Sequence, residues 1–168
     1  SAHEVSVVYA SFDNHRADDM NTYVYASVDG GTNFRSIGEG IPKGHTVTSM
    51  TEDPKNPNVL YSGTEFGLFV SPNRGGTWTR IKGNVPTVPI HEIVFHPRDN
   101  DMILATHGRS IWILDDATPL QQYPEAIKSD AFLFDMRAAS YFNQANDRGF
   151  TADKPFYGRN PAYGAPIN

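Results

Sequence analysis

The sequence predicts an all-β protein. The chain has 168 residues, of which 39% are hydrophobic and 20% are charged, and it contains 14 glycines and 12 prolines. Residues that favour strands and turns dominate over good helix formers. The length suits one domain with a real core, and the apolar fraction is too high for a disordered chain.

An internal repeat divides the chain into similar units. Segment 27–34, Ser-Val-Asp-Gly-Gly-Thr-Asn-Phe, returns 44 residues later as segment 71–78, Ser-Pro-Asn-Arg-Gly-Gly-Thr-Trp. Upstream, Tyr9 precedes Ser27 by 18 positions whereas Tyr61 precedes Ser71 by 10, so the first copy carries an eight-residue insertion within 12–22. A third, weaker copy follows, and its glycine-rich turn is lost at Asp115 and Asp116. Four short strands in about 44 residues, repeated, are typical of a β-propeller blade.

The strands follow from this repeat. The first copy lacks its innermost strand or has it truncated near the N-terminus. In the second copy we expect strands at 47–52, 59–64, 67–71 and 78–81. In the third copy we expect strands at 90–95, 102–106, 110–115 and 131–136, with a short helix within 119–129. Residues 1–142 are therefore expected to form a partial β-propeller of about three four-stranded antiparallel blades, and 143–168 an extended C-terminal linker.

The repeated turn has a structural interpretation. An Asp or Asn side chain at its third position accepts backbone N–H bonds, and the glycine two residues later supplies a positive φ. The aromatic residue at the end, Phe34 or Trp78, packs back under the turn, and we expect both rings to be largely buried. The residues given this structural role are Ser27, Asp29, Gly31, Phe34, Ser71, Asn73, Gly75, Thr77 and Trp78.

The pattern Ser-x-Asp/Asn-x-Gly-x-x-aromatic resembles the Asp-box, or bacterial neuraminidase (BNR) repeat. Asp-boxes mark propellers in sialidases, xyloglucanase-type glycosidases, photosystem assembly factors and sortilin-type receptors. Segments 64–71 and 106–116 look more closely like the C-terminal blades of uncharacterised secreted bacterial proteins called glycosyl-hydrolase-like or sortilin-like. The resemblance covers roughly residues 5–142, and it implies an extracytoplasmic location and a longer propeller. Because enzymes and non-enzymes share this fold, it does not fix the activity.

Propeller topology places the hairpin loops between the second and third strands of each blade on the face that ligands usually approach. Three such loops carry polar or aromatic side chains. The candidate ligand-binding residues are Asp13, His15, Arg16, Glu65, Phe66, His107 and Arg109. The arginines offer forked hydrogen bonds to a carboxylate or to sugar hydroxyls, and Phe66 offers a stacking face.

Enzyme motifs are weak. A glycosidase needs two carboxylates across the scissile bond, for which Asp13 or Asp18 with Glu65 are weak candidates. We expect no cofactor and no metal site, since the chain has no cysteine, no phosphate loop and no nucleophile elbow. A net charge of −5 without basic clusters argues against nucleic acid, and no apolar run is long enough to span a membrane.

The leading hypothesis is therefore a non-catalytic binding or interaction module of an extracytoplasmic bacterial propeller protein, with a protein or carbohydrate ligand. The alternative is a fragment of a glycoside-hydrolase-like propeller that acts on polysaccharide. An open arc of blades also leaves strand edges and apolar faces uncovered. The expected partners are thus the remaining blades of the propeller, from the same longer chain, from a bound fragment or by self-association.

Overall fold

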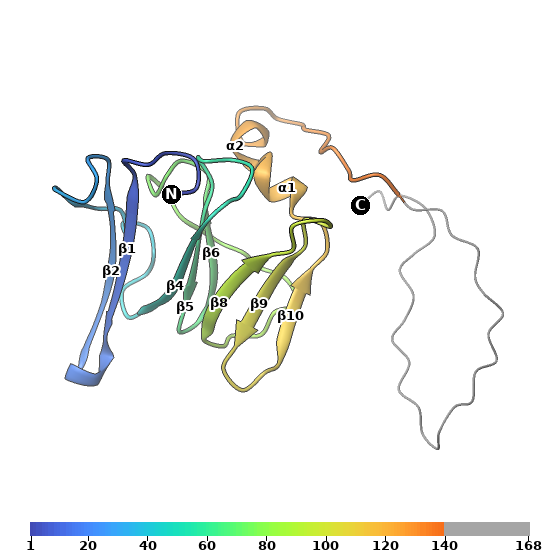
Figure 1. The fold of residues 1–168 in the computed structure, drawn as a ribbon. Helices are drawn as coiled ribbons and strands as arrows, with labels where there is room; N and C mark the ends of the chain where they lie inside the picture. The colour runs from blue at the N-terminus through green and yellow to red at the C-terminus, as the bar shows by residue number, and fades with distance from the viewer. Residues whose placement is uncertain (140–168) are drawn as a thin grey trace, which may run out of the picture. The chain divides into compact units, whose positions relative to one another are not determined.

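Three antiparallel sheets lie side by side in the part of the chain that the computed structural model describes, residues 1–139 (Figure 1). Sheet 1 contains β1 (Val8–Asn14), β2 (Asp19–Ser27) and β3 (Arg35–Ser36), with a 3-10 turn, η1 (His15–Ala17), between β1 and β2. Sheet 2 contains β4 (Val47–Glu52), β5 (Leu60–Thr64), β6 (Gly67–Ser71) and β7 (Thr79–Arg80). Sheet 3 contains β8 (Ile90–Phe95), β9 (Met102–Thr106) and β10 (Ile111–Leu114). The chain is a partial β-propeller, as the repeat predicts.

Strand pairing confirms the repeat residue by residue. Tyr25 pairs with Ser36 in sheet 1, and Phe69 pairs with Arg80 in sheet 2, so both partners are shifted by 44 positions. Upstream of the insertion the shift is 52, because Val8 pairs with Ser27 where Leu60 pairs with Ser71. Among residues 1–139, sheet 1 therefore begins at the equivalent of β5 and contains no counterpart of β4.

A backbone hydrogen bond that the sequence did not reveal recurs in all three sheets. The amide of Gly30 donates to the Ser6 carbonyl, that of Arg74 to Asn58, and that of Ala117 to Asn100, each at 2.8 Å. Each bond joins the third residue after the blade's third strand to the loop before its second strand. The third copy has lost the glycine-rich turn but keeps this bond. The strand geometry of the blade therefore does not require the turn motif.

Neighbouring sheets pack through apolar faces. We call the face of a sheet that contacts the preceding sheet its leading face, and the face that contacts the following sheet its trailing face. Between sheets 1 and 2 the core contains Val24, Ala26, Ile37, Ile41, Val47, Leu60, Phe69 and Trp78. Between sheets 2 and 3 it contains Val59, Tyr61, Leu68, Val70, Ile90, Ile93, Met102, Leu104 and Ala117. Alternation along β5 and β6 explains both cores, since Leu60 and Phe69 point one way and Tyr61, Leu68 and Val70 the other.

One expectation about the elements was wrong. Residues 131–136 do not form the fourth strand of sheet 3, and β10 ends that sheet. Without the glycine-rich turn the chain leaves β10 into two short helices, α1 (Thr118–Gln121) and α2 (Tyr123–Ala126), instead of returning alongside it. The short helix expected within 119–129 is confirmed in position, as two helical turns rather than one. The expected linker, 143–168, lies outside the described residues.

The expected burial of both repeated aromatic rings is half correct. Trp78 is only 8% exposed, because its ring lies between sheets 1 and 2. Phe34, at the equivalent position, is 47% exposed. It lies on the leading face of sheet 1, where no sheet of the described chain precedes it. Tyr9 lies on the other face of sheet 1, against the core shared with sheet 2, and its hydroxyl is buried without a partner among the described residues. The equivalent Tyr61 donates to Asp53 from the loop after β4, and sheet 1 has no counterpart of β4 to supply such a loop.

Candidate functional site

The three hairpins that join the second and third blade strands lie at one end of the sheets (Figure 1). They carry all seven candidate ligand residues. In the part of the chain that the structure describes, however, no hydrogen bond or ring contact joins one hairpin tip to another. The topology therefore places the three hairpin tips at the same end of the sheets, but their side chains do not contact one another.

The first hairpin is much longer than the second. Thr64 and Gly67 pair and enclose two residues, whereas the equivalent pair in the first hairpin, Phe12 and Tyr23, encloses ten. This difference accounts for the eight-residue insertion. It extends β1 and β2 past the edge of sheet 2 and closes them with η1 and with Asp18 in the left-handed conformation at φ 60°.

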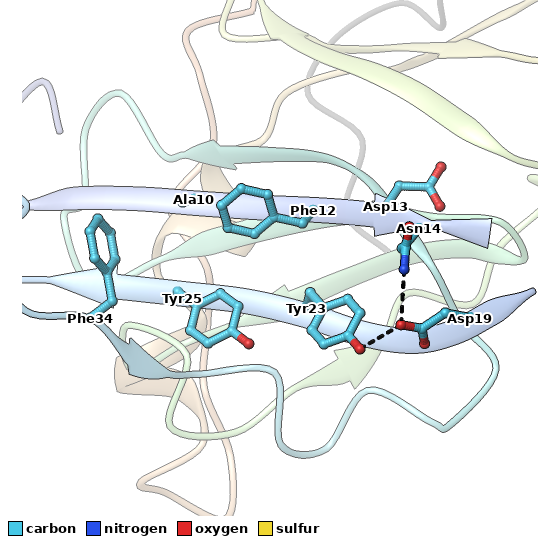
Figure 2. Close-up of a pocket in the computed structure, with 8 residues that line it drawn as sticks. All are labelled: Ala10, Phe12, Asp13, Asn14, Asp19, Tyr23, Tyr25 and Phe34. Carbon is cyan, nitrogen blue, oxygen red and sulfur yellow. Dashed lines mark hydrogen bonds between the residues drawn. The ribbon is translucent and has the colours of Figure 1, made fainter. Parts of the chain in front are cut away.

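A solvent-open groove of about 590 Å³ runs along the leading face of this hairpin (Figure 2). Aromatic rings line its length, and polar side chains gather at the hairpin end. Its lining residues are Ala10, Phe12, Asp13, Asn14, Asp19, Tyr23, Tyr25 and Phe34. The rings of Phe12 and Tyr25 meet edge to face at 6.1 Å. Apolar lining with a few polar groups at one end is the usual make-up of a ligand site.

Two carboxylates share the polar end of the groove, and hydrogen bonds hold both in place. Asp19 accepts bonds from the Tyr23 hydroxyl at 2.7 Å and from the Asn14 amide at 3.2 Å, and these lower its pKa to about 2. Asp13 accepts from the His15 backbone amide at 2.9 Å, the main cause that lowers the pKa of Asp13 below its ordinary value. The His15 ring also contacts it, with Nδ1 at 2.6 Å from Oδ2. Both groups are therefore anionic over the physiological pH range.

The other candidate residues belong to separate local clusters. The Phe66 ring meets His45 edge to face at 5.0 Å, and its backbone carbonyl accepts a bond from Arg80 at 2.8 Å. The His107 ring lies 5.4 Å from His91 on β8. The structure brings Asp13 and His15 together, but it places Glu65 and Asp18 outside the groove that contains Asp13. The catalytic pairing of Asp13 or Asp18 with Glu65 is therefore not found within this groove and stays a prediction.

The sequence reading missed the groove's main features. Phe12, Tyr23 and Tyr25 were not singled out, and Phe34 was assigned to packing alone. The sequence does contain a signal for an aromatic face on the two strands that flank the insertion. Tyr23 and Tyr25 are two residues apart, so their rings share one face of the sheet, and Phe12 pairs with Tyr23 on the same face.

Hydrogen bonds within each repeated turn hold its backbone in place. In the first, Asp29 Oδ1 accepts the amides of Thr32 and Asn33 at 3.1 and 2.9 Å, and these bonds with that of Ser27 lower the pKa of Asp29 to about 2. In the second, Asn73 Oδ1 accepts the Thr77 amide at 2.7 Å. The Trp78 ring Nε1–H then donates to the Ile37 carbonyl at 2.6 Å, so the second turn joins sheet 2 to sheet 1.

Among residues 1–139, no group of three or more His, Asp or Glu side chains is arranged to hold a metal ion. Within the same residues, no helix is long and apolar enough to cross a membrane.

Comparison with solved structures places this fold beside GH74 enzymes. An ancestral GH74 enzyme superposes with a TM-score of 0.53 and 24% identity over 65% of this chain and 13% of its own. The GH74 enzyme of Niastella koreensis superposes with a TM-score of 0.53 and 17% identity over 68% of this chain and 19% of its own. The chain thus spans less than a fifth of either enzyme's length, and the likeness is one of fold. No protein-family model and no curated protein sequence matches the chain.

Proposed function

We propose that the chain is a non-catalytic binding module of an extracytoplasmic bacterial Asp-box propeller protein, and that it binds carbohydrate at the lengthened hairpin of sheet 1. The observation that carries the proposal is the groove of Figure 2, where aromatic rings lie next to fixed carboxylates. A sugar presents an apolar C–H face to an aromatic ring and hydroxyl groups around its edge. Phe12 and Tyr23 offer the first surface, and Asp13 and Asp19 accept from the hydroxyls.

The charge state of the groove favours binding over catalysis. A glycosidase needs one carboxylic acid with a raised pKa to protonate the leaving oxygen, beside a second carboxylate. Asp13 and Asp19 both have lowered pKa values, because their hydrogen bonds stabilise the anion. Carboxylates held in the anionic form accept hydrogen bonds well and donate a proton poorly.

The alternative, a fragment of a glycoside-hydrolase-like propeller acting on polysaccharide, has one observation in its favour. Two carboxylates do line the same groove. The likeness in fold to GH74 enzymes agrees with it but extends over a small part of those chains. On this alternative, bound substrate would have to raise the pKa of Asp13 or Asp19 by displacing water and hydrogen-bond donors.

Affinity gel electrophoresis tests the binding proposal. The chain is run in native gels cast with xyloglucan, with mannan or with pectin, and retardation by at least one of these polysaccharides is expected. Tyr23→Ala should reduce the retardation roughly tenfold or more, since it removes a stacking face and the hydroxyl that holds Asp19. Phe132→Ala is the control, because this ring is 39% exposed and lies outside the groove. Equal mobility in all gels, or equal retardation of both variants, would contradict the proposal.

A reducing-sugar assay on the same polysaccharides separates the two functions. The non-catalytic module releases no sugar at any pH between 4 and 8, a range that brackets general-acid catalysis. Release that disappears in both Asp13→Asn and Asp19→Asn would establish the glycosidase alternative instead.

A further inference from the structure

The polar end of the groove is built by the hairpin of sheet 1 alone. Asn14 pairs with Asp19 beyond the pair of Phe12 and Tyr23, and the second hairpin already closes at the level of this latter pair. None of the residues between Phe12 and Tyr23 belongs to the core between sheets 1 and 2. This end of the groove therefore consists of inserted residues that lie beyond the packed part of the strands (Figure 1).

Neither carboxylate at this end forms an ion pair with a lysine or an arginine of residues 1–139. Asp19 accepts hydrogen bonds from neutral donors, among them the Tyr23 hydroxyl and the Asn14 amide. Asp13 accepts from His15, whose ring is charged only when it is protonated. No lysine or arginine is among the eight residues that line the groove. Hydrogen bonds from neutral donors hold the two anions in place but leave their charge uncompensated.

This end of the groove accepts hydrogen bonds better than it donates them. The Tyr23 hydroxyl directs its hydrogen to Asp19 at 2.7 Å, so the phenol oxygen remains an acceptor for a ligand (Figure 2). Asn14 also directs an amide hydrogen to Asp19. A hydroxyl or acetamido group both donates and accepts, whereas an ammonium group has three donors and no acceptor. An ammonium group therefore complements this end of the groove in hydrogen bonding as well as in charge.

Aromatic rings lie directly beside the carboxylates. Phe12 and Tyr23 pair across β1 and β2, and both line the groove. Phe12 is 59% exposed, so its ring is open to a ligand. The face of an aromatic ring attracts a cation, and it also packs against the apolar C–H face of a sugar. A flat ring that carries an ammonium group on its edge would use both the rings and the carboxylates.

We infer that the groove selects amino sugars, that is, glycan units with a free and protonated amino group, over neutral and N-acetylated units. The inference rests on the proposed carbohydrate binding and deepens it by naming the class of sugar. The sugar ring lies on Tyr23 and Phe12, and its ammonium group faces Asp19 and Asp13. A lysine side chain carries the same charge but has no flat C–H face, so it would use only the polar end of the groove.

Isothermal titration calorimetry with three matched tetrasaccharides tests this selectivity. The oligomers of glucosamine, N-acetylglucosamine and glucose differ only in the group on the second carbon of each sugar. At about pH 5.5 the amine is protonated, while Asp13 and Asp19, whose pKa values are lowered, are ionised. The glucosamine oligomer should bind roughly tenfold more tightly than the other two, or better, which is the gain expected from a charge-assisted hydrogen bond.

Two isosteric variants assign the selectivity to the carboxylates. Asp19→Asn and Asp13→Asn each keep an oxygen that accepts hydrogen bonds but remove the charge. Each should weaken binding of the glucosamine oligomer roughly tenfold and that of the glucose oligomer about threefold or less. Asp130→Asn is the matched control, because it removes the same charge at an exposed carboxylate outside the groove. Circular dichroism reports folding, and the two variants lie on different strands, so one serves if the other fails to fold.

The outcomes separate the inference from the proposed function. Equal affinity for the three oligomers would overturn the inference and leave the proposed function standing. An equal loss of glucosamine binding in Asp130→Asn and Asp19→Asn would also overturn it, because the net charge of the chain would then be the cause. Tetralysine that binds more tightly than the glucosamine oligomer would identify a cationic peptide as the ligand instead. Absence of binding to all three oligomers would overturn the inference, and it would contradict the proposed function only if the polysaccharide gels also show no retardation.

Discussion

Trp78 supplies the sharpest test of how the sheets hold together. Its ring is 8% exposed between sheets 1 and 2, and its Nε1–H donates to the Ile37 carbonyl at 2.6 Å. Trp78→Ala removes both contributions and should lower the free energy of unfolding by about 3–5 kcal/mol, the range for large-to-small core changes. Since small domains are stable by about 5–15 kcal/mol, this is a large part of the total. Trp78→Phe keeps most of the ring but leaves the carbonyl unpaired, and should cost about 1–2 kcal/mol.

The repeat provides a matched control at the equivalent position. Phe34 is 47% exposed, so Phe34→Ala loses about half the burial of a phenylalanine, or about 1 kcal/mol. Urea unfolding followed by far-ultraviolet circular dichroism measures all three variants, at a concentration where the unchanged chain is monomeric. The expected order of destabilisation is Trp78→Ala, then Trp78→Phe, then Phe34→Ala.

Equal losses for Trp78→Ala and Phe34→Ala would refute the reasoning, because they would mean that the contact with sheet 1 adds nothing at Trp78. A Trp78→Phe variant as stable as the unchanged chain would refute the part assigned to the hydrogen bond with Ile37.

Three further predictions concern the turns and the core. Asp29 has a pKa of about 2 against an ordinary value of about 3.9, so its stabilising effect is complete above about pH 4 and is lost as the pH falls toward 2; Asp29→Asn should flatten that part of a plot of urea midpoint against pH. Tyr61→Phe leaves the buried Asp53 carboxylate without its 2.9 Å bond and should cost about 1–3 kcal/mol in thermal or urea unfolding, a value near zero being evidence that the bond is not formed. Gly75→Ala should cost about 2–4 kcal/mol, since φ is +85° and a Cβ would lie 2.7 Å from that of Ile37; unchanged stability would show that the turn is not pressed against sheet 1.

The fold could be predicted where the repeat carried it. Matching 27–34 with 71–78 fixed the positions of β6, and alternation gave β4, β8 and β9 at their observed bounds. The strand prediction failed in the third copy, where the sequence no longer matches the repeat. After β10 the sequence 131–136 still has a strand-like composition, but no turn leads the chain back to the sheet. Composition reports that a segment is able to form a strand, and only the preceding turn decides whether it reaches the edge.

The candidate site was predictable only in outline. Topology placed Asp13, Glu65 and His107 at one end of the sheets, but loop composition could not say that the tips make no contact with one another. Phe34 shows a second limit. Its place in the repeat equals that of Trp78, yet burial depends on the neighbouring sheet, which is a property of the assembly that a position in a motif cannot report.

The insertion in the first hairpin has an even number of residues, and it falls at the tip. Because the added residues lie beyond the pair Phe12–Tyr23, the strands below this pair keep their register, and Val24 and Ala26 still face sheet 2. The length of the hairpin tip can thus change without affecting how the lower parts of β1 and β2 pack against sheet 2. Pairs of residues could be added or removed there without turning any core side chain toward solvent, which makes the hairpin a place where a blade can acquire a new surface while its architecture stays constant.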